Sequence, residues 1–328
     1  MENATSNSSK LKPLASISLD LDNLWSYMKT HGDAGWESFP SYFDTFIPLV
    51  LDVLDELDLK ITFFIVGQDA ALEKNHATLK LITERGHEVG NHSFSHEPWL
   101  HLYPKDQIRR EILLTEKNIQ QVTDQKPIGF RGPGFSWSRN LFEILLENGY
   151  IYDASTLPTY LGPLARLYYF WTSNLTENEK KQRKVLFGGF KNGKRPVKPY
   201  YWGLPSGERL AEMPVTTMPI FKTPFHLSYL LYISQFSKIL MPFYLNAAIF
   251  LCKTTKTVPS FLLHPLDFLG GDQVPELAFF PGIGLSGEHK FAVFNKVIRM
   301  LSKHYKIVNM STHAEYIIKG GNLKEIQL

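Results

Sequence analysis

The sequence has little cysteine, little net charge and no long uninterrupted apolar run. The single cysteine among 328 residues, Cys252, excludes an intramolecular disulfide, is compatible with a reducing compartment, and is most simply a buried apolar residue. The formal net charge of +3 is too small to indicate nucleic-acid binding, so we expect no nucleic-acid partner. Residues 1–12 are polar and lack the apolar core of a secretory signal, and we expect a disordered tail there.

The most apolar segment, residues 225–251, is too interrupted to favour a membrane span. Polar or helix-breaking residues occur throughout it, at His226, Gln235, Lys238, Pro242 and Asn246. A central charge is costly in a bilayer. We expect two helices broken at Pro242 that pack on the domain as a cap. The alternative is that they lie in a membrane interface.

Apolar residues alternate between the spacing of strands and that of helices. Strands are predicted over residues 15–21, 61–66, 87–90, 128–130, 150–152, 210–215, 260–263 and 306–308. Helices are predicted over residues 46–57, 69–85, 105–122, 138–149 and 288–305. With 44% hydrophobic residues the chain can bury a large core. The alternation favours an α/β fold with a parallel sheet, and about eight strands favour a (β/α) barrel in one domain, residues 13–328.

Two histidines stand four residues apart in RGHEVGNHSFSH, residues 85–96, behind a predicted strand. Neutral imidazoles commonly bind transition metals, and this spacing aims the rings of His92 and His96 at one point. Asp20 and Asp22 follow another predicted strand and offer a carboxylate ligand. An Asp/His/His set leaves coordination positions open for water and substrate. Two histidines in ordinary surface or core positions are the alternative interpretation of this spacing alone.

Further candidate residues also follow directly on predicted strands, namely Arg131, Asp153 and His264. The carboxyl ends of barrel strands gather residues that are distant in sequence. We therefore expect these three side chains to converge with the aspartates and histidines.

The segment RGHEVGNHSFSH, with the upstream Asp-x-Asp, resembles the polysaccharide deacetylases of the NodB-homology type. Three further segments follow in the order that the family requires: FRGPGF at 130–135, YDAS at 152–155 and FLLHP at 261–265. The resemblance thus extends from residue 18 to residue 265. It implies a distorted, incomplete (β/α) barrel of the NodB-homology type.

The resemblance implies that Asp22, His92 and His96 bind one divalent metal. Zinc is the first expectation, and cobalt, iron, nickel or manganese also suit these ligand types. Such an ion would polarise an amide carbonyl and lower the pKa of bound water. The resemblance assigns Asp20 to take the proton of that water.

The remaining catalytic roles follow the same resemblance. Hydrolysis of an amide also needs an acid opposite the base, and we expect His264 to protonate the departing nitrogen. Arg131 is expected to hold and orient Asp20, and Asp153 to position His264. Four residues are expected to contact substrate: Pro133, Phe135, Trp137 and Leu263.

The first motif departs from the family pattern in a way that bears on the substrate. Many members carry adjacent aspartates followed by glycine, whereas here Leu21 separates Asp20 from Asp22 and Asn23 follows. The spaced form resembles relatives that act on small or lipid-carried sugars. We therefore expect a metal-dependent deacetylase of an N-acetylated sugar or sugar-lipid intermediate. The alternatives are a cyclic-amide hydrolase of the allantoinase-like kind and a catalytically silent glycan-binding protein.

Two insertions do not fit a minimal barrel, residues 157–209 and 225–251. Within the first, residues 180–199 carry eight basic and no acidic residues. A basic loop beside an apolar cap suits a sugar joined through phosphate to a lipid. We therefore expect a cytoplasmic enzyme with peripheral contact at the inner membrane surface. The alternative is a solvated loop and a folded cap.

Overall fold

The structure is a computed structural model that describes residues 12–162 and 193–328. Most of the predicted tail, and the part of the basic stretch that precedes residue 193, lie outside the described residues. In the described part of the chain no helix has both the length and the apolarity to span a bilayer.

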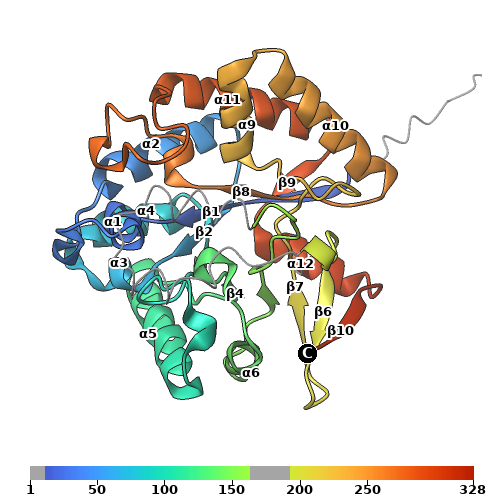
Figure 1. Cartoon of the computed structure of the whole chain (residues 1–328). Helices are drawn as coiled ribbons and strands as arrows, with labels where there is room; N and C mark the ends of the chain where they lie inside the picture. The colour runs from blue at the N-terminus through green and yellow to red at the C-terminus, as the bar shows by residue number, and fades with distance from the viewer. Residues whose placement is uncertain (1–11, 163–192) are drawn as a thin grey trace, which may run out of the picture.

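Ten strands of the described residues form one sheet, in the order β10-β6-β7-β5-β4-β3-β2-β1-β8, with β9 paired to the beginning of β1 (Figure 1). The strands are β1 Leu14–Leu21, β2 Thr62–Ile65, β3 Glu88–Asn91, β4 Gly129–Phe130, β5 Tyr152–Asp153, β6 Tyr200–Gly203, β7 Arg209–Glu212, β8 Ser260–Leu263, β9 Lys306–Val308 and β10 Lys324–Gln327. Only the β6–β7 pair is antiparallel among them. The outer strands β8 and β10 do not pair, so the sheet is open, as expected for a distorted, incomplete barrel.

Helices cover the sheet, and Figure 1 shows α2, α9, α10 and α11 above it and α5 and α6 below it. Their bounds are α1 Leu24–His31, α2 Phe43–Glu56, α3 Gly67–Ala71, α4 His76–Glu84, α5 Lys105–Thr123, α6 Arg139–Glu147, α9 Leu227–Phe236, α10 Leu240–Thr254, α11 Gly287–Ser302 and α12 Met310–Lys319. The sequence predicted most of these helices to within a few residues. It did not predict α12 or α1, and α1 begins where the Asn23 side chain accepts from the Leu24 amide.

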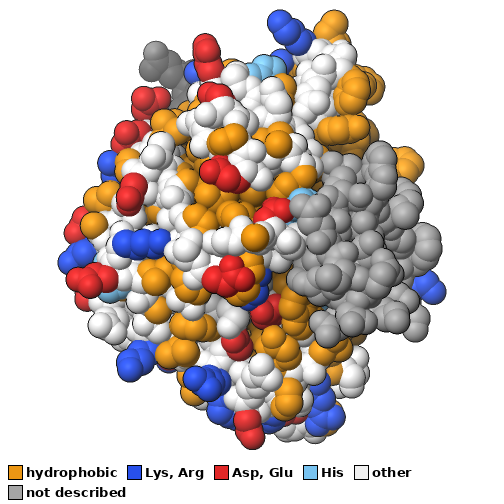
Figure 2. Space-filling view, turned by 60° about the vertical axis from the view of Figure 1, so that its left-hand side comes forward, with side chains coloured by type: hydrophobic (Ala, Val, Ile, Leu, Met, Phe, Trp, Pro, Cys, Tyr) orange, Lys and Arg blue, Asp and Glu red, His pale blue; other side chains and the backbone are white. Residues whose placement is uncertain are grey.

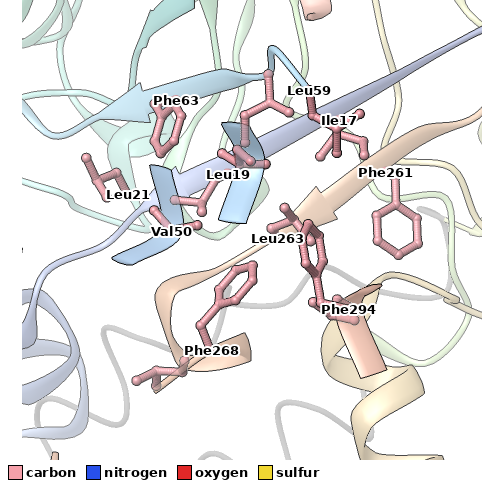
Figure 3. Packing of buried hydrophobic residues seen from close by; sticks show 14 of the residues in the cluster. Ile17, Leu19, Leu21, Val50, Leu59, Phe63, Phe261, Leu263, Phe268 and Phe294 are labelled. Carbon is pink, nitrogen blue, oxygen red and sulfur yellow. The ribbon is translucent and has the colours of Figure 1, made fainter. Parts of the chain in front are cut away.

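The central strand β1 separates an apolar layer from a polar interior. Ile17, Leu19 and Leu21 alternate along it and are almost completely buried in the main hydrophobic core. Figure 3 shows Ile17 and Leu19 beside Phe261 and Leu263 of β8. Burying a side chain of this size stabilises the fold by about 1.5–3 kcal/mol. Because side chains alternate along a strand, the even-numbered residues, which include both aspartates, face the other side.

The predicted helix over residues 69–85 is wrong as a single element. The chain forms α3, then an extended residue, Leu72, a 3₁₀ turn over Glu73–Asn75, and α4. The Asn75 side chain donates to the backbone oxygen of Asp69 at 3.1 Å and to its carboxylate at 3.2 Å. These side-chain bonds compete with helical backbone bonds, which accounts for the interruption.

The apolar segment 225–251 forms two helices, α9 and α10, but the predicted break at Pro242 is wrong. The break lies at Ser237, whose backbone is extended and whose hydroxyl accepts from the amides of Ile239 and Leu240. Pro242 lies in the first turn of α10, where its missing N–H has no helical partner to lose. Both helices place apolar side chains in the main core, among them Leu230 and Leu245.

The sequence also missed two strands at one edge of the sheet. Residues 200–203, which fell within the predicted insertion 157–209, form β6 and pair with both β7 and β10. The last strand, β10, is only four residues long and contains a single apolar residue, Ile326. Such a short pattern is not distinguishable from a polar terminus in sequence.

Candidate metal and catalytic site

The predicted site residues converge at the carboxyl ends of the parallel strands. Asp22 follows β1, His92 follows β3, Arg131 follows β4, and His264 follows β8, while Asp153 is the last residue of β5. Strand pairing brings these ends together, since β1 lies between β2 and β8, and β3 lies between β2 and β4. The side chains are positioned by rigid strands rather than by long loops.

Asp22, His92 and His96 form a three-residue cluster with ligand atoms within 4.8 Å of one another. The Oδ1 atom of Asp22 lies 2.9 Å from Nε2 of His96 and 3.4 Å from Nε2 of His92. All three residues are buried. Within the described residues, Asp22 Oδ1 has no hydrogen bond of ordinary geometry despite these two close nitrogens. Three buried ligand atoms that lie this close together, one of them without a satisfying hydrogen bond, fit a divalent metal.

The charges in the cluster favour an ionised aspartate. Burial alone would raise the pKa of Asp22, but the charge of His96 and the contacts with both imidazoles outweigh it and hold the pKa well below its ordinary value. The Nδ1 atom of His92 contacts the Arg131 carbonyl at 2.6 Å. A ring N–H donated to that carbonyl leaves Nε2 free to act as a ligand.

The loop that carries His96 is held by Glu111 of α5, a residue that the sequence did not single out. One carboxylate oxygen accepts from the amides of Phe94 and Ser95 at 2.9 and 2.8 Å, and the other accepts from the Ser95 hydroxyl at 2.7 Å. His96 itself has a positive φ of 52°. A non-glycine residue in this region is strained, so the loop must be fixed by its surroundings.

Asp20 is paired with Arg131 beside the cluster of Asp22, His92 and His96. Nη1 of Arg131 donates to Oδ1 of Asp20 at 2.6 Å and to the Ser18 hydroxyl at 2.8 Å, and Nε donates to the Ala154 carbonyl at 3.0 Å. The guanidinium also lies over the Phe64 ring at 4.4 Å. Arg131 is fully buried, and the contacts of its Nε and Nη1 atoms fix its orientation, whereas its Nη2 atom has no hydrogen-bond partner among the described residues.

His264 lies on the other side of Asp20, with Nε2 at 4.0 Å from Asp20 Oδ2. Its backbone amide donates to Oδ2 of Asp267 at 2.8 Å, and its Nδ1 lies 3.9 Å from the same atom. Lys290 of α11 holds this loop by donating to the carbonyls of Leu266 and Leu269 at 2.8 and 2.6 Å. Among the described residues Asp267 thus contacts His264 directly, and the positioning role expected of Asp153 stays a prediction.

Asp153 has a different environment from the one predicted. Its carboxylate accepts from the hydroxyl and amide of Ser155 at 2.6 and 3.1 Å. It also meets the carboxyl of Glu212 on β7, and both acids are completely buried. Burial raises the pKa of both, and the adjacent Asp153 charge raises that of Glu212 further. We interpret the pair as a shared-proton link between β5 and β7.

The four predicted substrate contacts divide between surface and core. Pro133 is buried and Phe135 is partly exposed, in the 3₁₀ turn that follows β4. Trp137 packs 4.7 Å from Trp202 and lies under the Arg195 guanidinium at 4.2 Å, so much of its ring is committed to core contacts. Leu263 exposes no surface and belongs to the hydrophobic core. Its predicted contact with substrate is wrong for this structure, because the side chain faces the helix layer.

Asn23, the residue after Asp22, is held by a buried hydrogen-bond network. Its side chain donates to Asp69 Oδ1 at 2.7 Å, and the Trp25 indole donates to the same oxygen at 3.0 Å. Burial raises the pKa of Asp69 to about 7, although the bonds from Asn23 and Trp25 act to lower it. The network fixes the backbone that follows Asp22.

Residues 32–152 match the family described as Polysaccharide deacetylase. The predicted resemblance to the polysaccharide deacetylases is confirmed. The segment matched to this family contains His92, His96 and Arg131, whereas Asp20, Asp22, Asp153 and His264 lie outside it. The placement of those four residues rests on the geometry described above.

Relatives within the polysaccharide deacetylases match part of the chain. It is 36% identical over 88 residues, 27% of its length, to a peptidoglycan-N-acetylglucosamine deacetylase of Bacillus cereus, of which 31% is covered. It is 31% identical over 112 residues, 34% of its length, to a peptidoglycan deacetylase of Helicobacter pylori, of which 37% is covered. The chain thus spans about a third of the length of these relatives.

The fold of the whole chain has a counterpart among solved structures. A crystal structure from Mycobacterium smegmatis, provisionally assigned as a polysaccharide deacetylase, superposes with a TM-score of 0.59 at 17% identity. The match covers 97% of this chain and 98% of the other. At this identity the likeness shows the fold alone.

Proposed function

We propose that the protein is a metal-dependent hydrolase that removes N-acetyl groups from a glycan. The observation that carries the proposal is the placement of the Asp22, His92 and His96 cluster beside the buried Asp20–Arg131 pair, with His264 beyond Asp20. The relatives named as peptidoglycan deacetylases support an N-acetylated glycan as substrate.

The metal would be held by one carboxylate and two imidazoles, a ligand set that suits zinc and is compatible with cobalt, iron, nickel or manganese. When bound, it would supply polarisation of the acetyl carbonyl and a more acidic water. Asp20 takes the proton of the attacking water at its Oδ2, since Arg131 occupies Oδ1. His264 gives a proton to the departing nitrogen, and Asp267 holds its backbone in place.

A direct test is acetate release from N-acetylated chitooligosaccharides and from peptidoglycan fragments by purified, metal-loaded protein. We expect release that a chelator abolishes and that metal restores. Hydrolysis of allantoin and related cyclic amides, with no acetate release, would favour the cyclic-amide hydrolase instead. Saturable oligosaccharide binding without turnover of any acylated sugar would favour a silent glycan-binding protein.

For the finer substrate class, we propose a lipid-linked N-acetylated glycan reached by peripheral membrane contact. The support is an exposed apolar surface on α9 and α10, formed by Tyr232, Phe236, Ile239, Leu240, Phe243 and Phe250. Ile239 is 81% exposed and Phe243 is 70% exposed. Helices α9 and α10 lie at the top of the molecule in Figure 1. Figure 2, which is turned about the vertical axis, shows hydrophobic side chains at the same upper edge. Soluble proteins rarely expose such large apolar side chains together.

Charge around this surface favours an anionic lipid layer. Residues 219–256 contain four lysines and no acidic residue. Of the predicted basic stretch 180–199, Lys194 and Lys198 are exposed in the described part. Arg195 is instead stacked on Trp137 and Trp202 and serves packing. Basic residues beside an apolar surface are typical of interfacial binding.

The test is flotation with vesicles of anionic and of neutral phospholipid. The triple variant Phe236→Ser, Ile239→Ser, Phe243→Ser should lose association with anionic vesicles, whereas Tyr316→Ser, an exposed aromatic on α12, should not. The same triple variant should turn over a lipid-phosphate sugar more slowly while a soluble acyl-sugar is unaffected. Equal effects on both substrates, with no vesicle association, would contradict this part of the proposal. A cytoplasmic location stays a prediction.

A further inference from the structure

We infer that His226, which precedes α9, contacts a polar group of the sugar next to the scissile amide. The inference rests on the proposed function and assigns a substrate contact to a segment outside the deacetylase motifs. His226 lies in the apolar segment 225–251, where the sequence indicated only a polar interruption.

The residues at the beginning of α9 lie beside His264, on one side of the site. The rings of His226 and His264 lie 6.3 Å apart in an edge-on arrangement. Two residues further on, Ser228 makes a side-chain hydrogen bond to Asp267, the residue that holds the His264 backbone. His226 and Ser228 thus both meet the groups that surround His264.

The His226 side chain has an unused hydrogen-bonding atom in this position. The residue is 6% exposed, and its Nδ1 is buried without a hydrogen-bond partner among residues 12–162 and 193–328. The Tyr229 ring packs edge-on against it at 4.8 Å and supplies no acceptor or donor there. Leaving a buried polar atom unpaired costs about 1–3 kcal/mol. A substrate hydroxyl that pairs with Nδ1 would offset this cost only in the complex.

The electrostatic surroundings keep the ring neutral. Burial, together with the charges of His264 and Arg131, lowers the pKa of His226 to about 3. A neutral imidazole has one donor and one acceptor nitrogen. A sugar hydroxyl likewise donates and accepts, so the two groups are complementary in either tautomer. A second cation beside His264 would instead oppose the charge that a protonated His264 carries.

The experiment compares two probes and two variants. The probes are tetra-N-acetylchitotetraose, which has sugar hydroxyls, and 4-nitrophenyl acetate, which has none. His226→Phe keeps the ring shape and removes both nitrogens, whereas His226→Gln keeps a donor and an acceptor. We expect His226→Phe to lower kcat/KM for the oligosaccharide about 10-fold, mainly through KM, and to leave the ester within about 2-fold. His226→Gln should recover most of the loss.

Two outcomes would overturn the inference. An equal loss for both probes would show that His226 acts through His264 or through folding, and no loss for either would show that it makes no contact. Thermal unfolding of each variant, with His304→Phe as a surface control, shows whether an equal loss for both probes comes from misfolding. If the wild type releases no acetate from the oligosaccharide, the proposed function fails independently. Calorimetric binding of the same oligosaccharide then decides: weaker binding to His226→Phe supports the contact, and unchanged or absent binding refutes it.

Discussion

Arg131 and Asp20, 111 positions apart in the chain, form a buried ion pair at 2.6 Å. The pair is built into the barrel interior, because the guanidinium also bonds Ser18 and the Ala154 carbonyl. A buried charge that loses its partner is left without solvation, and breaking such a pair commonly costs about 3–5 kcal/mol. The same pair would therefore serve both the stability of the fold and the proton transfer that we propose for Asp20.

Substitutions at this pair should separate the two contributions. Asp20→Asn keeps an oxygen that accepts from Arg131, so we expect nearly unchanged metal content and a fall in kcat of about two to four orders of magnitude. Arg131→Met leaves the Asp20 carboxylate buried and unpaired, and we expect about 3–5 kcal/mol less stability to urea. Stoichiometric metal analysis, acetate release and urea unfolding are the measurements. Full activity in Asp20→Asn would exclude it as the base.

Substitution of a proposed metal ligand should lower the metal content of the protein more than it lowers the stability of the fold. His92→Ala and His96→Ala should each lose stoichiometric metal, since Asp22 and one imidazole leave an incomplete site. His304→Ala, a partly exposed histidine on the loop after α11, is the matched control and should retain metal. The measurement is metal per mole of purified protein by plasma mass spectrometry. Retention of one equivalent by both ligand variants would refute the assignment.

Acid should destabilise the metal-free protein through buried neutral histidines. Burial lowers the pKa of both His87 and His313 to about 4, below the 6.5 of an unfolded histidine. The unfolded chain thus binds more protons between pH 6.5 and 4, and stability is lost as pH falls through this window. Each histidine should contribute about 1–2 kcal/mol of loss at pH 5. Urea unfolding at pH 7.5 and 5 should show a smaller loss for His313→Gln than for wild type or His289→Gln.

Cys252 should report whether α10 stays docked on the core. The thiol exposes no surface, and burial raises its pKa to about 12. A thiolate is the reactive form, so Ellman's reagent should label native protein very slowly at pH 8 and rapidly in urea. Anionic vesicles should leave the labelling slow if the helices bind through their outer surface alone. Cys252→Ala combined with Lys253→Cys, at the exposed neighbouring position, is the control that should label at once.

The sequence predicted the cluster of Asp22, His92 and His96 because Asp22 and His92 each follow a strand of the parallel sheet, where strand pairing brings the ends close, and His96 is only four residues after His92. The Asp-Leu-Asp spacing has the same physical basis, since period-two alternation puts Asp20 and Asp22 on one face and Leu21 in the core. The register of β1 with β8 fixes where His264 meets them, and the registers of β1 with β2 and of β2 with β3 fix where His92 does.

The remaining site residues were beyond prediction because they lie on elements whose position depends on packing. Asp267 follows His264 in a 3₁₀ turn that Lys290 of α11 holds, and Glu111 reaches the His96 loop from the middle of α5. His226 lies beside His264 because α9 packs against β8. None of these side chains follows a strand, so no periodicity in the sequence points them towards the metal cluster.

The pairing of β1 also bears on how the chain folds during synthesis. Ser16 to Leu19 pair with Ser260 to Leu263, and Leu14 to Ser16 pair with Lys306 to Val308. Strand β1 therefore waits for partners that are made about 240 and 290 residues later. Such non-local pairing slows folding and leaves an apolar strand edge open to wrong partners in the meantime. We expect nascent chains stalled before residue 260 to be protease-sensitive and to bind chaperones that recognise extended apolar segments.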